Sequence, residues 1–294
     1  MAEEQSRSEV MDNLLVDLVG KGVVLPLVLS FTLTGVLRVA MGQSNGQIVA
    51  VSAVGATYFM TYIALFGWPP FPPVASGQKI VYLAMFGLFI GIMLELRPES
   101  RSIHRLAAIV WPGVVVGWLG WRQLMNLSTD VLLITGILWL AGIFVSLQLL
   151  RNRGPTSEPS ILVLVAAIGA SLVALFGASG SIGQQFGVVA AAMGGFILWN
   201  WPVPRFQFGA LGAVSIGGTL MALATQTVLF TNASKTALAI ILFVFLTPLL
   251  ADRFPFAERP ALATATFGIV AAIPAILASV VAFVTTGDSF ELPI

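Results

Sequence analysis

The side chains of this chain that are able to take part in chemistry are few and mostly uncharged. The sequence has no cysteine and a single histidine, His104. These counts exclude disulfides, thiolate metal sites, cysteine nucleophiles and a haem held by two histidines. We therefore expect no metal, no cofactor and no catalytic residue.

One short segment, Gly177-Ala178-Ser179-Gly180, resembles the Gly-x-Ser-Gly nucleophile motif of rhomboid intramembrane proteases. The resemblance implies a histidine on a later helix as the general base, because a serine nucleophile needs one. No histidine follows Ser179, and His104 lies upstream between arginines. Glycines in this segment are instead explained by a tight turn, so we expect that the protein is not an enzyme.

Uncharged polar residues inside apolar segments are the better candidates for function, as the lining of a substrate path. Thr57 and Thr61 lie one helical turn apart and therefore on one face. The alternative is structural, because a hydroxyl inside a membrane helix can bond its own or a neighbouring helix, at about 0.6 kcal/mol. The candidates for the path are Gln47, Thr57, Thr61, Gln184, Gln185 and Thr225.

The composition predicts which elements must hold these residues. The chain of 294 residues is 57% hydrophobic and 9% charged, with a net charge of +1. Soluble domains are roughly 45–50% apolar and about 25% charged. A water-facing surface needs more charge than this, and a nucleic-acid partner needs a basic field that is missing here. The predicted fold class is all-α, a polytopic bundle of membrane helices.

Apolar runs divide the chain into about ten transmembrane helices. About 20 residues of helix cross the hydrocarbon. Breaks fall at Gly42 to Asn45, at the proline-rich 68–73 and at 97–101, where turn residues gather. The expected spans are 22–41, 46–67, 79–96, 104–123, 130–150, 160–179, 183–201, 207–230, 235–251 and 261–285.

The chain aligns with itself at an offset of about 137 residues. Ser44-Asn45-Gly46-Gln47 meets Ser181-Ile182-Gly183-Gln184, and Trp68-Pro69-Pro70 later meets Trp201-Pro202-Val203. Because the unit holds five spans, its second copy would enter the membrane from the opposite face, as in the inverted repeats of many carriers. The alternative is a chance likeness between helices of similar composition. Trp68 and Trp201 are then either paired gates or interface anchors.

The repeat sets the expected domains. Residues 1–21 form an N-terminal interfacial segment, 22–150 the first five-helix repeat, and 151–294 the second repeat with a short C-terminal tail. In the first segment, Leu14, Leu15 and Leu18 share one helical face, which suits a helix lying in the membrane interface. A frayed tail is the alternative. The acidic start lacks the basic region of a cleavable signal.

Basic residues predict the orientation, since cytoplasmic loops are enriched in lysine and arginine. We expect the loops after odd-numbered spans to be cytoplasmic and both termini to be periplasmic, in a bacterial inner membrane. The odd loops and their flanks hold Arg38, Arg97, Arg101, Arg105, Arg151, Arg153, Arg205, Arg253 and Arg259. The other side holds Arg7, Lys21, Lys79, Arg122 and Lys235.

Two functions remain open at this point. The chain length and the five-plus-five layout resemble those of carriers of the drug/metabolite type, which favours a small secondary carrier for a neutral or weakly anionic solute. Because Glu95 and Asp130 fall at span ends, coupling through a mid-membrane carboxylate is not expected. The alternative is a non-catalytic transmembrane subunit of a larger complex. The expected partners are membrane lipids and, for the subunit, other membrane subunits or further copies of the chain.

Overall fold

The fold is entirely helical in the part of the chain that the structure describes. The computed structural model describes residues 19–96, 100–126, 128–151, 154–177, 179–250 and 260–287. Across these ranges the helices are joined by short loops, with one isolated antiparallel bridge between Pro155 and Gln207. The predicted fold class, an all-α polytopic helix bundle, is confirmed. Most of the expected N-terminal interfacial segment, residues 1–18, lies outside the described residues.

The helices follow one another closely along the chain. η1 and η2 are π-helical, and η3 is a 3-10 helix. In order they are η1 (Gly20–Val24), α2 (Leu25–Val49), α3 (Ser52–Phe66), α4 (Ser76–Glu95), α5 (Arg101–Leu124), α6 (Thr129–Leu149), α7 (Glu158–Phe176), α8 (Gly180–Trp199), α9 (Gly209–Gly212), η2 (Ala213–Gly217), α10 (Gly218–Phe230), α11 (Lys235–Ile241), η3 (Leu242–Leu249) and α12 (Pro260–Gly287).

Most of these helices are long and apolar enough to cross a bilayer. Among the described residues eight have the necessary length and hydropathy, and Ser52–Phe66 and Lys235–Leu249 are shorter apolar helices. Each expected span coincides with one of these ten segments. The number of crossings stays a prediction, because a helix of 15 residues is about 22 Å long and shorter than the hydrocarbon.

The first sharp turn lies where the sequence predicted a break. Gly42 has φ 75° and ψ 179° inside α2, a conformation that favours glycine. The chain reverses there, so that a Cβ on Gly46 would lie only 3.0 Å from the Cα of Arg38. Beyond the turn the helix runs on towards α3 through Ala50, whose N–H donates to Gly46 O at 3.1 Å. The second expected span thus starts near its predicted position.

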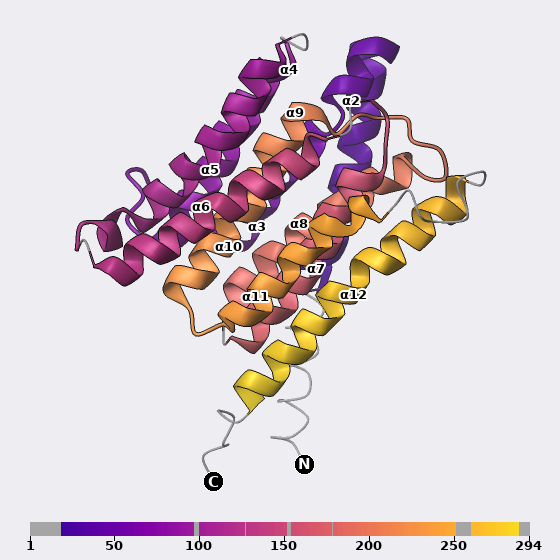
Figure 1. Ribbon diagram of the computed structural model, residues 1–294. Helices are drawn as coiled ribbons and strands as arrows, with labels where there is room; N and C mark the ends of the chain where they lie inside the picture. Colours follow the sequence, from indigo (N-terminus) through magenta and orange to yellow (C-terminus); the bar gives the residue numbers. More distant parts are fainter. Residues whose placement is uncertain are drawn as a thin grey trace, which may run out of the picture.

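A continuous helical run at 209–230, formed by α9, η2 and α10, is the central helix of the bundle. In its apolar stretch 78% of the residues are buried, against 28% for α12 at the outer edge (Figure 1). Helices α3, α4, α5, α6 and α8 all pack against it. In Figure 1, α4, α5 and α6 lie together on one side of the molecule and α12 on the other.

Glycines allow the neighbours to approach the central helix closely. A Cβ on Gly91 of α4 would lie 3.0 Å from the Cα of Leu211, and one on Gly87 would lie 2.9 Å from the carbonyl oxygen of Val214. Small residues at a helix contact let backbones meet where lipid supplies no hydrophobic drive. The Gly87 and Gly91 pair therefore serves packing inside this chain.

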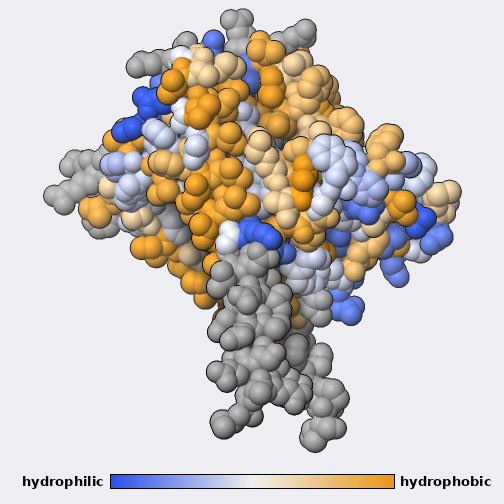
Figure 2. Space-filling model, turned by 180° about the vertical axis from the view of Figure 1, so that it is seen from behind, coloured by the Kyte–Doolittle hydropathy of each residue, from blue (hydrophilic) through white to orange (hydrophobic). Residues whose placement is uncertain are grey.

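The outer surface is apolar, as a lipid-facing surface must be. Figure 2 shows broad orange areas on the face seen from behind. Large side chains on the outer helices are more than half exposed, among them Phe89 of α4 at 60%, Ile137 of α6 at 63% and Ile269 of α12 at 68%. Exposed apolar area on this scale marks contact with lipid. The protein is an integral, multi-pass membrane protein.

The loops gather at two ends of the bundle. One end, called here the arginine face, bears Arg38, Arg101, Arg105, Arg151 and Arg205. There the last part of α2, beyond the turn at Gly42, meets the loop 200–208, because Gln207 N–H donates to Gln47 O at 3.1 Å. Arg38 also lies over the ring of Phe206, 5.8 Å from its centroid. At the opposite face, Gln123 donates to the carbonyl of Leu229 at 3.0 Å and thereby joins α5 to α10.

Candidate functional site

Three of the predicted path residues lie in the closed interior. Thr57, Thr61 and Thr225 are fully buried, and no hydrogen-bond partner meets their hydroxyl groups. Other threonines of the central helix behave differently, since the Thr227 hydroxyl donates to Leu223 O at 2.8 Å. Bonding to the helix backbone is the usual way to satisfy such a group. These three hydroxyls therefore do not make the structural bonds that were the alternative to a path.

The three predicted glutamines take three different places. Gln185 is buried, and its Oε1 accepts a hydrogen bond of 2.8 Å from the Tyr58 hydroxyl, which joins α8 to α3. Gln184 is half-buried beside Gly22 of η1. Gln47 is exposed on the arginine face, where its carbonyl meets the loop 200–208. The structure brings Gln185 together with Tyr58 and leaves Gln47 at the surface.

Further unpartnered polar groups lie near the predicted ones. The Ser215 hydroxyl belongs to the π-helical η2 and lies so close to α3 that a Cβ on Gly55 would be 2.7 Å away from it. Single π-helical turns occur often at functional sites. Gln226 Oε1 also has no partner. Sequence reasoning missed Ser215, although its place between the glycines of a predicted span was a usable signal.

A polar cavity opens on the arginine face, between the α4–α5 corner, the end of α6 and the start of the central helix. Its volume is about 670 Å³. It is called here the arginine cavity, after Arg101, Arg105 and Arg151. The full lining is Glu95, Arg101, His104, Arg105, Leu147, Gln148, Leu150, Arg151, Gly154, Gln207, Gly209 and Ala210.

The one carboxylate of this lining is already engaged by the backbone. Glu95 Oε2 accepts a hydrogen bond of 3.1 Å from Leu211 N–H, in the first turn of the central helix. Gly209 has φ 56°, and a Cβ there would lie 2.9 Å from both carboxylate oxygens. An acidic group at a helix N-terminus is favoured by the helix dipole. Glu95 thus ties α4 to the start of the central helix.

The described lining of the cavity carries a net positive charge. Its three guanidinium groups face one carboxylate, and His104 holds the α4–α5 corner through a contact of 3.2 Å between its Nε2 and Leu94 O. Guanidinium groups bind carboxylates and phosphates through paired hydrogen bonds. The arrangement is therefore chemically suited to a small anion.

The arginine cavity and the buried hydroxyl groups of the interior both border the central helix, but these hydroxyl groups do not line the cavity. Gly209 and Ala210 line the cavity and begin the central helix, which further along carries Ser215 and Thr225. Thr57, Thr61 and Thr225 do not line the arginine cavity, and all three are 0% exposed. The interior is closed in this conformation.

Trp68 and Trp201 lie in loops at opposite ends of the bundle. Trp68 follows α3 at the face opposite the arginines and is 75% exposed, while Trp201 follows α8 on the arginine face and is 43% exposed. The loop after Trp201 is folded around Asn200, whose Oδ1 accepts hydrogen bonds from the N–H groups of Arg205 and Phe206. Both rings thus lie outside the buried polar interior.

These observations define an all-α integral membrane protein with buried hydroxyls in its interior and a positively charged cavity at one face. In the described ranges, no three histidine, aspartate or glutamate side chains are grouped to hold a metal ion. Comparison of the chain with protein-family models gives no match, and comparison with curated proteins gives none either.

Proposed function

We propose that the protein is a small secondary carrier for a small anionic solute, which enters through the arginine cavity. The main support for this proposal is that the positively charged cavity ends at the first residues of the central helix, Gly209 and Ala210. The same helix bears Ser215 and Thr225, whose buried hydroxyls have no partner. No catalytic role is proposed for any residue.

Buried hydroxyls without a partner support a path through the interior. A hydrogen bond to such a group inside a membrane protein is worth about 0.6 kcal/mol, so a solute that bonds to it gains this free energy. The acidic residues of the described chain, Glu95, Asp130 and Glu158, all lie at helix ends. Passage would therefore depend on hydroxyls and backbone carbonyls, and a conformational change must open the interior alternately to the two faces.

An inverted repeat of 22–150 and 151–294 forms part of this proposal. Its support is that α2 and α3 form one antiparallel pair and α7 and α8 another, at equivalent places in the alignment. Helix α3 also packs against its counterpart α8, through the bond from Tyr58 to Gln185. Such self-pairing of equivalent helices is expected near a twofold axis.

The proposed orientation puts the arginine face in the cytoplasm of a bacterial inner membrane and both termini in the periplasm. Among described residues the arginine face bears Arg38, Arg101, Arg105, Arg151 and Arg205, and the opposite face bears Lys21, Lys79, Arg122 and Lys235. These are five against four, and over the whole sequence the odd loops and the other side hold nine against five, which supports a cytoplasmic arginine face by the positive-inside rule. A C-terminal alkaline phosphatase fusion should be active, and an inactive fusion on inserted protein would reverse the orientation.

A transmembrane subunit of a larger complex remains the second candidate, because the interior is closed and filled. The central helix is the most buried of the spans. For this role, purification in mild detergent should yield the chain with stoichiometric companions, whereas a carrier should elute alone or as copies of itself.

Access of water to the interior separates the two candidates. Thr57→Cys, Thr61→Cys and Thr225→Cys can each be made in a chain without native cysteine. For a carrier, a small water-soluble thiol reagent should modify them during opening of the interior. Ser181→Cys, at an exposed position, is the positive control, and Ala192→Cys, in the apolar core, is the negative one. If all three threonine positions stay as unreactive as Ala192→Cys, the carrier proposal is wrong.

A further inference from the structure

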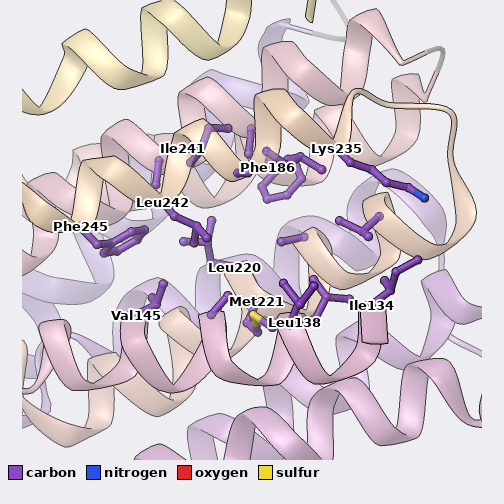
Figure 3. A pocket seen from close by; sticks show the side chains of 18 residues that line it. Ile134, Leu138, Val145, Phe186, Leu220, Met221, Lys235, Ile241, Leu242 and Phe245 are labelled. Atoms are coloured by element: carbon purple, nitrogen blue, oxygen red, sulfur yellow. The ribbon is translucent and has the colours of Figure 1, made fainter. Parts of the chain in front are cut away.

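An apolar groove crosses part of the bundle between α6 and the α11–η3 segment. Its volume is about 240 Å³. Leu138 and Val145 line it from α6, Leu242 and Phe245 line it from the other wall, and Phe186 of α8 lies at its base (Figure 3). Every lining side chain except that of Lys235 is apolar. The groove therefore suits a hydrocarbon chain.

The length of the groove matches one leaflet of a bilayer. Its lining on α6 extends from Ile134 to Val145, which at about 1.5 Å per residue is about 16 Å. The hydrocarbon of a bilayer is about 30 Å thick, so this is about half of it. On α6 the lining runs from Ile134, the sixth residue of the helix, to Val145, the seventeenth of its 21 residues. On the other wall it begins at Lys235, the first residue of α11. The groove thus runs inward from the face opposite the arginines.

A single cation marks the outer end of the groove. Lys235 is the exposed first residue of α11, next to Ser234, whose hydroxyl accepts a hydrogen bond from Ala237 N–H. In Figure 3 the nitrogen of Lys235 points away from the apolar lining. Within the described residues its ammonium makes no ion pair or hydrogen bond. It therefore lies where a lipid headgroup would be, and no described residue matches its charge.

We propose that this groove binds one acyl chain of an anionic phospholipid, whose phosphate pairs with Lys235. The apolar lining accepts the chain, the length corresponds to one leaflet, and the ammonium complements the headgroup. The attraction between an ammonium group and a lipid phosphate acts at either face of the membrane, so the argument does not depend on the orientation of the chain. The lipid would fill the gap between α6 of the first half and α11–η3 of the second. The inference is independent of the carrier proposal.

A second groove provides an internal comparison. It lies between α7 and α12, has a volume of about 410 Å³ and is lined by apolar residues such as Ile168, Ile276 and Phe283, with Ser279 the one polar side chain. No charged residue lines it. Lipid there should be held without preference for headgroup charge, so variants in this groove are matched controls.

The test counts lipids on the intact, purified protein by native mass spectrometry. Phosphatidylglycerol and phosphatidylcholine with the same acyl chains are supplied in equal amounts. The wild-type protein should retain phosphatidylglycerol preferentially, and Lys235→Gln should reduce this preference about fivefold, the value of one basic side chain near anionic lipid. Lys235→Arg should keep the preference.

Filling the groove tests the acyl chain separately from the charge. Leu138→Trp should lower the number of retained phosphatidylglycerol molecules by one, whereas Ile276→Trp in the uncharged groove should leave the preference unchanged. Equal retention of the two lipids by the wild type would overturn the proposal, as would unchanged behaviour of both Lys235→Gln and Leu138→Trp. If the wild-type protein is a dimer and Leu138→Trp dissociates it, the groove binds a second copy of the chain. This result would also overturn the proposal.

Discussion

The interior around the central helix and the arginine cavity hold polar groups in opposite ways. In the interior the groups are uncharged, buried and partly unpartnered, as at Thr57 and Ser215. In the cavity they are charged and open to solvent, as at Arg101 and Arg151. The difference follows from the solvent, because a charge at mid-membrane costs several kcal/mol and a hydroxyl much less. Recognition of an anion at the surface and passage through the interior thus need different side chains.

The largest expected effect concerns the tightness of the interior. Gly91→Ala places a methyl group 3.0 Å or less from Leu211 of the central helix, and this backbone contact has no flexible side chain to yield. Overpacking of this kind costs about 1–3 kcal/mol. We expect a clear fall in the thermal unfolding temperature of the purified protein.

Gly117→Ala is the control for this substitution, because nothing lies within 4 Å of the new methyl group. It should leave the unfolding temperature unchanged or raise it slightly, since alanine favours helix more than glycine does. If the two variants are equally stable, Gly91 is not tightly packed against Leu211. The contrast between a closely packed interior and an open arginine cavity would then be wrong.

The next effect concerns the charge of the cavity. Gln148 lines it, so Gln148→Cys gives a single thiol inside the positive field. A negatively charged thiol reagent should react about tenfold faster than a positively charged one of similar size, because a cleft focuses the field of its charges. The ratio is measured from the reaction rates of the two reagents with the thiol at low salt.

Two comparisons test whether the arginines of the cavity cause the faster reaction of the negatively charged reagent. Adding Arg151→Gln should lower it, and so should high salt, which screens exposed charges. Ser181→Cys lies outside the cavity and should show little charge preference. A Gln148→Cys ratio close to one would remove the basis for anion entry at this face.

A smaller effect is expected for the one buried polar pair of α3 and α8. Tyr58→Phe leaves Gln185 Oε1 without its donor, and Gln185→Leu leaves the Tyr58 hydroxyl without its acceptor. Each change should lower the free energy of unfolding by about 1 kcal/mol. The double variant should lose less than the sum, because both partners are then apolar. Additive losses would show that the two side chains are not coupled.

The comparison also shows which features the sequence could predict. The spans follow from apolar runs of sufficient length, and the turn at Gly42 follows from glycine and polar residues between two such runs. That Thr57 and Thr61 share one helical face follows from their spacing, whereas their burial is seen only in the structure. All of these features are local in the chain, where composition and period carry the information.

The arginine cavity could not be predicted in this way, because its parts come together only in the folded chain. Arg101 and Arg151 lie at the ends of different helices, and Glu95 meets Leu211, 116 residues further along. In the sequence these arginines predicted orientation alone. Ser215 was missed because its importance comes from the close approach of Gly55, a contact between distant helices.

The smallest expected effect compares two threonines and bears directly on the interior. Thr57→Val removes a hydroxyl that has no partner, so it should leave the free energy of unfolding unchanged or raise it slightly. Thr227→Val removes a hydroxyl that bonds Leu223 O, and should cost about 0.6 kcal/mol, the value of such bonds in membranes. Thermal unfolding of the two variants in the same detergent measures the difference. If Thr57→Val is the more damaging, its hydroxyl has a structural partner after all, and the argument that the interior hydroxyls wait for a solute loses its support. If the order is as expected, Thr57 is retained in the chain for a reason other than stability, as the lining of a path requires.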